Sequence, residues 1–166
     1  MGKYTFVELD KSDTVQILPN LFSILYTNMN RIAPSGCSYA EDEAMWLAYM
    51  EQQMHLLYPK IILMYVHDAL AGYFQYSVSG NTLMVDEVEI KHEYQRTMLF
   101  FSLCRYLCEQ LLPKVEYIEA YVNKGNSQSL RINKKLGLEI VGENKSGRSW
   151  LLRGYAKDVG AYFQHR

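Results

Sequence analysis

The chain has 166 residues, of which 49% are hydrophobic and 21% are charged, so the sequence predicts a globular unit with a sizeable core and argues against disorder. The formal net charge of -1 gives no overall attraction for nucleic acid, and no apolar run is long enough to cross a bilayer. The first residues lack the apolar core of a signal peptide, which predicts a cytoplasmic protein without a membrane partner.

The N-terminal segment predicts a strand followed by a long helix. Residues 3–10 are rich in β-forming side chains that alternate loosely, which is typical of a strand. A helix is predicted over 14–32, with Ser12 or Asp13 as its N-cap. Pro19 lies inside this range, so we expect a kink or an early break there.

A second helix and a hairpin are predicted next. Apolar residues recur at helical spacing over 39–58, acidic residues occupy the first turn, and Pro59 ends the segment. Residues 60–66 and 70–79 are strand-like and are joined by a short turn, which predicts a hairpin. Within the hairpin, Gly72 indicates a bulge or a close approach of two backbones.

The remaining elements alternate between strands and helices. Residues 82–90 predict a third long strand, and 97–112 predict a helix that is apolar on most sides and therefore buried on more than one face. A further strand is predicted over 115–123 and a last pair of strands over 138–145 and 148–156.

A short helix is predicted between those strands. Asn126 or Ser127 opens it as an N-cap, and Gly137 closes it. The resulting order, β-α-α-β-β-β-α-β-α-β-β, predicts an α/β fold with a mixed, mostly antiparallel twisted sheet that is flanked by helices. No repeat or linker-like stretch interrupts the sequence, so we expect one domain over 1–166.

Three cysteines cannot all pair within one chain. Cys104 and Cys108 are four residues apart in the apolar run and would share one face of its helix, whereas Cys37 lies far from both. A metal site would need further ligands at suitable spacing, and none is nearby. We therefore predict reduced cysteines and no metal site.

Two motifs resemble a known family in their order and spacing. The loop "QRTMLF" at 95–100 precedes the apolar helix, and "NSQSLRINKKLGL" begins at Asn126 with Asn133 in its middle. These motifs and the element order are similar to the GNAT superfamily of acyl-CoA-dependent N-acyltransferases, over nearly the whole chain. The family carries Arg/Gln-x-x-Gly-x-Gly/Ala in the loop and a tyrosine in the short helix, so the chain departs from its pattern at both places.

The resemblance implies that the loop binds the pyrophosphate of acetyl-CoA, a co-substrate, through backbone N–H groups at the start of a helix. The residues so implied are Gln95, Arg96, Thr97, Met98, Leu99 and Phe100. Met98 and Phe100 stand at the glycine positions, so binding requires that their side chains point away from the phosphates. The alternative is a loop that only begins a buried helix. Asn126 and Asn133 would contact the cofactor near the pantetheine arm. The alternative for Asn126 is a plain N-cap without a ligand.

The resemblance also implies where the chemistry takes place. A backbone N–H near Val88, Glu89 and Ile90 would polarise the thioester carbonyl. A carboxylate on the same strand (Asp86, Glu87 or Glu89) would accept the proton of the amine, and we choose Glu87 although a bulge would reverse the alternation.

The proton donor to the leaving thiolate is the second catalytic group. The family uses the tyrosine of the short helix, and Asn133 cannot act as an acid at that position. Tyr121 on the next strand is the catalytic candidate for this role. Glu119 and Tyr121 are also the next candidates, after the acids of 82–90, for accepting the proton of the amine. The implied function is N-acetyl transfer from acetyl-CoA to a primary amine of a small molecule or peptide. The alternative is a catalytically impaired acyl-CoA sensor or interaction module. We expect acyl-CoA and an amine as partners, with no nucleic acid, and leave a homodimer open.

Overall fold

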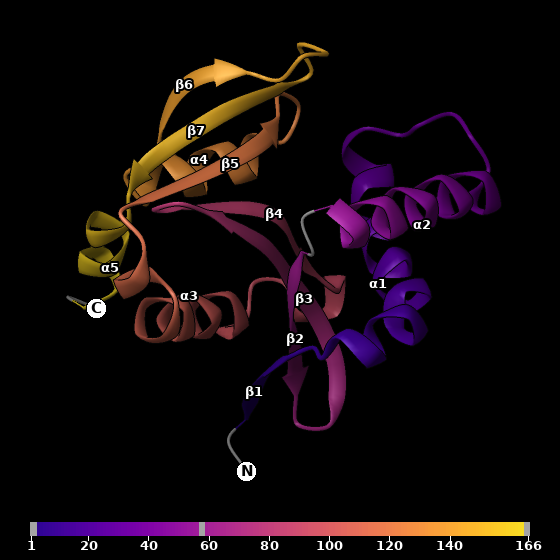
Figure 1. Cartoon of the computed structure of the whole chain (residues 1–166), viewed down its shortest axis with the longest axis horizontal. Coiled ribbons are helices and arrows are strands. Elements are labelled where there is room, and N and C mark those ends of the chain that lie inside the picture. The colour runs from indigo at the N-terminus through magenta and orange to yellow at the C-terminus, as the bar shows by residue number, and fades with distance from the viewer. Residues whose placement is uncertain (1–2, 57–58, 165–166) are drawn as a thin grey trace. The chain divides into compact units, whose positions relative to one another are not determined.

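The computed structural model describes residues 3–56 and 59–164 and shows an α/β fold (Figure 1). Its seven-stranded sheet has the strand order β1-β2-β3-β4-β5-β7-β6 and is mostly antiparallel, with β4 and β5 paired in parallel. This confirms the predicted fold class. The described residues fall into two compact units, those within 1–75 and 87–99 and those within 76–86 and 100–166.

The first unit contains the N-terminal strands and two long helices. Strands β3 and β4 begin or end in it and continue into the second unit. Its elements are β1 (Tyr4–Glu8), α1 (Lys11–Ile32), α2 (Tyr39–Leu56), β2 (Lys60–Val66), β3 (Ala69–Ser79), the end of β4 (Thr82–Ile90) and the 3-10 helix η1 (His92–Tyr94).

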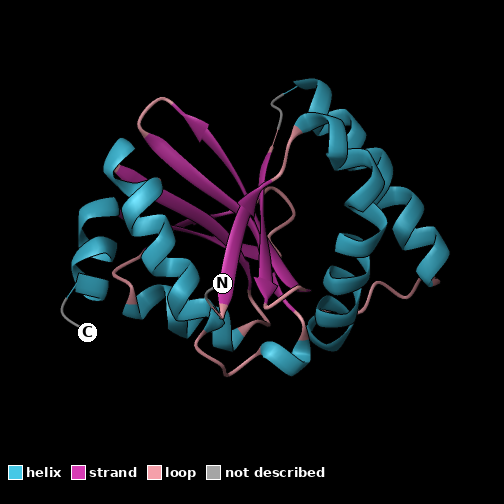
Figure 2. Ribbon diagram, turned by 90° about the horizontal axis from the view of Figure 1, so that it is seen from below, coloured by secondary structure: helices cyan, strands magenta, loops and turns pink. Residues whose placement is uncertain are grey.

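Helices α1 and α2 lie side by side and cover one core (Figures 1 and 2). Burial of mostly apolar side chains from both helices and from two strands holds this core together, because apolar surface removed from water stabilises the fold by about 25 cal/mol per Å². The buried members are Leu18, Leu21, Ile24, Met50, Ile61, Leu63 and Tyr73.

Helix α1 differs from the prediction at its start and at its proline. Asp10 is the N-cap residue, and the backbone N–H of Asp13 already donates to the Asp10 carbonyl at 3.1 Å. Ser12 and Asp13 therefore lie inside the first turn, and the predicted cap is wrong. The helix continues through Pro19, whose ring is exposed to solvent, so the predicted early break does not occur.

Helix α2 begins with a capping box. The backbone N–H of Ser38 donates to Glu41 Oε2 at 2.8 Å, and the Glu41 N–H donates to Ser38 Oγ at 3.3 Å. This reciprocal pair satisfies two N–H groups that the helix leaves free. The helix ends at Leu56, and the predicted residues 57–58 lie outside the described part of the chain.

The second unit holds the remaining strands and three helices. Phe101 and Phe163 contact each other edge to face in this unit, with ring centroids 5.3 Å apart. Its elements are the end of β3, the start of β4, α3 (Leu99–Gln110), the 3-10 helix η2 (Leu112–Lys114), β5 (Tyr117–Asn123), α4 (Ser127–Lys135), β6 (Glu139–Glu143), β7 (Ser149–Tyr155) and α5 (Ala156–Gln164).

Helix α5 is absent from the sequence prediction. Ala156, Val159 and Phe163 are buried, and their spacing of three and four residues is that of one helix face. The predicted last strand ended at Ala156, which the structure places at the start of this nine-residue helix.

Candidate active site

The C-terminal end of β4 carries a buried carboxyl group. Glu89 is 8% exposed, and the amide of Asn28 on α1 reaches it, with Asn28 Nδ2 2.6 Å from Glu89 Oε2. Asn28 Nδ2 also donates to the Ile90 carbonyl at 3.0 Å. A polar side chain buried at this depth is stable only when it is hydrogen-bonded, and Asn28 supplies that bond.

Burial raises the pKa of Glu89 to about 7, while hydrogen bonds with Asn28 and with Glu87 act in the opposite direction. Burial dominates because the charged carboxylate loses its water. A hydrogen bond between two carboxyl groups also requires that one of them carry a proton. The pKa of Glu89 therefore lies near neutral pH, and Glu87 is its hydrogen-bond partner on the same strand.

Tyr73 on β3 lies in the same environment. Its hydroxyl is buried and has no hydrogen-bond partner in the described part of the chain. Burial raises the pKa of Tyr73 well above its ordinary value, and the carboxylates of Glu87 and Glu89 raise it further. Tyr73 thus stays neutral at physiological pH, and its phenol adds no charge near the carboxyl groups of Glu87 and Glu89.

The Glu89 carboxyl predicts a distinct dependence of stability on pH. Its pKa is higher in the folded chain (about 7) than its ordinary value of 4.5, so the folded state binds the proton more tightly. This contribution to stability is fully present below pH 4.5 and is lost as the pH rises through 7, which amounts to about 3 kcal/mol. Urea unfolding at several pH values should show this loss in the wild type, and E89Q should remove it. Equal slopes in the two proteins would contradict the burial of a titrating group.

Gly72 on β3 allows the backbones of β3 and β4 to meet at this point. A Cβ atom at Gly72 would lie 2.2 Å from the Glu89 carbonyl oxygen. The backbone N–H of Lys91 donates to the Ala71 carbonyl at 2.8 Å, which closes the contact between the strands. This confirms the predicted close approach, and it fixes the backbone that carries Glu89.

The loop after η1 presents free backbone donors. The Gln95 N–H donates to the carbonyls of Lys91 and His92, both at 3.2 Å. In contrast, the N–H groups of residues 96–98 have no hydrogen-bond partner in the part of the chain that the structure describes. Three successive N–H groups before a helix are the arrangement that binds anions.

Arg96 and Thr97 shape this loop. Arg96 has φ 62°, a left-handed conformation that is strained for a residue with a Cβ atom. Thr97 Oγ1 accepts from the Leu99 N–H at 3.2 Å and donates to the Tyr94 carbonyl at 2.7 Å, so it caps the start of α3. The Arg96 side chain is exposed, which leaves its charge available to a ligand.

The two residues at the glycine positions of the resemblance differ in burial. Met98 is 57% exposed, and Phe100 is half-buried, whereas Leu99 between them is fully buried. Met98 is therefore not a core residue, and its thioether lies on the solvent side of the loop. The flexible methionine side chain can move aside more readily than a branched one.

The other sequence candidates lie in the second unit. Asn126 caps α4, and its Oδ1 accepts from the Ser129 N–H at 3.0 Å. Asn133 Nδ2 donates to the Ser129 carbonyl at 2.9 Å, so this amide is already bonded within α4. On β5, Tyr121 is exposed, whereas Glu119 lies 3.3 Å from Arg153 Nη1 in an ion pair.

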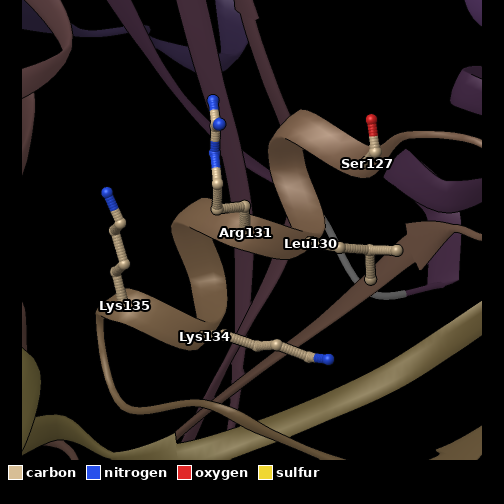
Figure 3. A pocket seen from close by; sticks show the side chains of 5 residues that line it. All are labelled: Ser127, Leu130, Arg131, Lys134 and Lys135. Carbon is tan, nitrogen blue, oxygen red and sulfur yellow. The ribbon is translucent and has the colours of Figure 1, made fainter.

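Helix α4 also borders a shallow hollow with a basic lining (Figure 3). Arg131 and Lys135 point to the same side of the helix, and Lys134 points to another. These three cations form no ion pair with any described residue. The hollow offers positive charge and no proton acceptor. Its lining consists of Ser127, Leu130, Arg131, Lys134 and Lys135.

The sequence suggested Glu87, Glu89 and Gln95 but missed Asn28. The structure brings the Asn28 amide to Glu89, and Gln95 Nε2 lies 3.3 Å from Asn28 Oδ1. A local signal for Asn28 did exist. It follows Leu21 and Leu25 at helical spacing, and a polar residue on an otherwise apolar stripe indicates a buried partner.

The fold is that of the GNAT acetyltransferases. A PaiA N-acetyltransferase from Thermoplasma acidophilum in complex with coenzyme A has a TM-score of 0.65 and 14% identity, over 93% of this chain and 99% of that one. An acetyltransferase from Thermus thermophilus has a TM-score of 0.69 and 13% identity, over 93% and 97%. A protein from Desulfovibrio desulfuricans assigned to the GNAT family has a TM-score of 0.66 and 12% identity, over 92% and 99%.

At these identities the likeness defines the architecture. No protein-family model matches the sequence, and no curated protein matches it significantly. Within the described residues, no helix is long and apolar enough to span a membrane. The comparisons thus confirm the predicted GNAT fold. Evidence on activity comes from the residues at the end of β4 and in the loop at 95–100.

Proposed function

We propose that the chain is an acyl-CoA-dependent N-acyltransferase that moves an acetyl group from acetyl-CoA to a primary amine of a small molecule or peptide. The observation that carries this proposal is the buried Glu89 carboxyl, whose pKa of about 7 suits a proton acceptor at neutral pH. It lies at the end of a strand in a fold that the coenzyme A complex from Thermoplasma acidophilum shares.

The loop residues support binding of the diphosphate of the co-substrate. The free N–H groups of residues 96–98 would donate to its oxygens, and the exposed Arg96 guanidinium would add a charge-assisted contact. The start of α3 directly follows and contributes roughly half of a positive elementary charge. Because the proposed donors are backbone atoms, they would hold the diphosphate without glycine in the loop.

The carboxyl pair supports the chemistry of transfer. Acetyl-CoA supplies an activated thioester. The amine nitrogen forms a bond to the carbonyl carbon, its proton passes to the Glu87–Glu89 pair, and the carbon–sulfur bond breaks to release a thiolate. Backbone N–H groups near residues 88–90 are proposed to stabilise the negative carbonyl oxygen. Tyr121, whose phenol is exposed on β5, is the proposed donor of a proton to the thiolate.

The contribution of Arg96 to binding can be measured directly. We expect R96A to weaken coenzyme A binding by about tenfold, because it removes one charge-assisted hydrogen bond. The loss should shrink at high salt, since Arg96 is exposed and its charge is screened. Titration calorimetry with coenzyme A at two salt concentrations tests this. R105A removes an exposed arginine of α3 and is the matched control. Equal affinity of R96A and R105A would exclude Arg96 from the site.

The proposed activity is tested by release of coenzyme A thiol from acetyl-CoA across a panel of primary amines and short peptides. We expect saturable turnover with at least one amine and a rise of the melting temperature with acetyl-CoA. If acetyl-CoA changes neither the melting temperature nor the thiol signal with any amine, the proposal is wrong.

A second candidate function is an acyl-CoA sensor or interaction module without turnover. Two observations favour it. Met98 is exposed at a glycine position of the resemblance, and Asn133, at the position of the family's tyrosine, already donates to Ser129. This candidate predicts stabilisation by acetyl-CoA without thiol release. Turnover of any amine at an ordinary enzymatic rate would reject it.

A further inference from the structure

The amide of Asn28 has a single orientation. The Ile90 carbonyl can only accept hydrogen bonds, so the Asn28 atom 3.0 Å from it must be the nitrogen. The same nitrogen lies 2.6 Å from Glu89 Oε2, and its two hydrogens are thereby divided between these two oxygens. Glu89 Oε2 is then an acceptor toward Asn28.

Gln95 holds the amide from the other side. Gln95 Nε2 donates to the Ile90 carbonyl at 2.9 Å and lies 3.3 Å from Asn28 Oδ1, which can only accept. Asn28 therefore uses its amide nitrogen and its amide oxygen within one network of three side chains. Such a network is rigid, since any rotation of the amide would place like groups against each other.

We infer that Asn28 is a positioning residue for the proposed proton acceptor: its amide fixes Glu89 Oε2 by hydrogen bonding and stabilises the ionised carboxylate. This inference rests on the proposed function, because it assigns Glu89 the role of receiving the amine proton. Asn28 acts through Glu89 and is not expected to contact the amine. A hydrogen bond to the ionised form is about twice as strong as one to the neutral form, so its loss disfavours the carboxylate.

Few other charges face this carboxyl. Glu87 lies on the same strand, and Tyr73 on β3 is neutral. Asn28 from α1 and Gln95 from the loop carry no charge. Arg31, one turn beyond Asn28, is exposed and lies 2.9 Å from His92 Nδ1 in η1. The hydrogen bond from Asn28 is therefore the contact from α1 that favours the charged form of Glu89.

The free protein provides the first test. Carbon-13 NMR of side-chain-labelled glutamate, with the Glu89 signal assigned from E89Q, measures the titration midpoint directly. We expect N28A to raise this midpoint by about one pH unit. N28D keeps the shape of the side chain, replaces the donor with an acidic group, and should raise the midpoint further. N30A, which truncates an exposed asparagine on the same helix, should leave it unchanged. Unchanged midpoints in both N28A and N28D would overturn the inference. N28D also serves if the smaller alanine lowers stability too far.

The pH profile of acetylation separates this inference from the proposed function. The acidic limb of kcat/KM should move to higher pH in N28A and not in N30A, because a smaller fraction of Glu89 is then ionised at each pH. If the wild type acetylates no amine while the NMR midpoint still moves in N28A, the proposed function fails and the contact between Asn28 and Glu89 stands. If the wild type is active and neither the midpoint nor the limb moves, the role of Asn28 is wrong.

Discussion

Replacing Glu89 by glutamine is expected to lower kcat for amine acetylation by about 10²- to 10⁴-fold, the usual contribution of a positioned general base. Glutamine has nearly the same shape and can still accept from Asn28, but it cannot take up a proton. Because the Glu89 side chain is buried and is not proposed to contact acetyl-CoA, the substitution should leave KM for acetyl-CoA almost unchanged. Steady-state kinetics with the best amine of the panel, at a pH above 7, measures both quantities.

Two further variants make this result specific. E93Q neutralises an exposed glutamate in η1 and should keep the wild-type kcat. E87Q removes the outer member of the carboxyl pair and should lower kcat less than E89Q, because Glu89 retains its own carboxyl. A normal kcat in E89Q together with a large loss in E87Q would reverse the assignment. A normal kcat in both would remove the carboxyl pair from the mechanism.

The strands of the sheet were predictable from local patterns. The predicted ranges 60–66 and 82–90 coincide with β2 and β4, because turn residues bound continuous β-forming segments on both sides. The short helix from Ser127 to Lys135 also follows its local signals, with Asn126 as the cap. Residues close together in the sequence specify each of these elements, so local sequence patterns are enough to predict them.

The depth of the carboxyl groups was not predictable in the same way. Alternation along β4 places Glu87 and Glu89 on one face but does not decide which of them is buried. The burial of Glu89 depends on its contact with α1, and the contacting residue, Asn28, lies 61 residues before Glu89 in the sequence. From the sequence, the acidic residues of one strand were therefore candidates for the proton acceptor, with Glu87 favoured, and the contact with α1 is the reason that we propose Glu89 instead.

Backbone conformation was the other missing part. The resemblance located the loop at 95–100 and implied binding through backbone N–H groups, but it did not give the backbone conformation that would present them. The structure gives Arg96 the left-handed φ of 62° that glycine usually adopts, and no described residue accepts a hydrogen bond from the N–H groups of residues 96–98. Side-chain identity predicts such a conformation poorly, since arginine rarely adopts it.

The second large effect is expected from G72A, which should lower the free energy of unfolding by about 3 kcal/mol or more, as over-packing against a rigid backbone does. The added Cβ would lie 2.2 Å from the Glu89 carbonyl oxygen and 3.0 Å from the Ile90 Cα. Both are backbone atoms, so relief requires that β3 and β4 move apart. Urea unfolding monitored by circular dichroism measures the loss.

The same substitution at Gly160 is the matched control. Apart from its chain neighbours and the backbone of its own helix, no atom of the described residues lies within 4 Å of a Cβ built at Gly160, which is inside α5. G160A should therefore raise stability by about 0.5–1 kcal/mol through helix propensity. Opposite signs for the two glycines would show that contact with Glu89, and not glycine replacement in general, sets the cost. Because the strand movement also shifts the backbone of Glu89 relative to Asn28, G72A should lose acetylation even at temperatures where it stays folded. A stable and fully active G72A would mean that the backbones of β3 and β4 lie farther apart than the 2.2 Å between a Cβ at Gly72 and the Glu89 carbonyl oxygen implies.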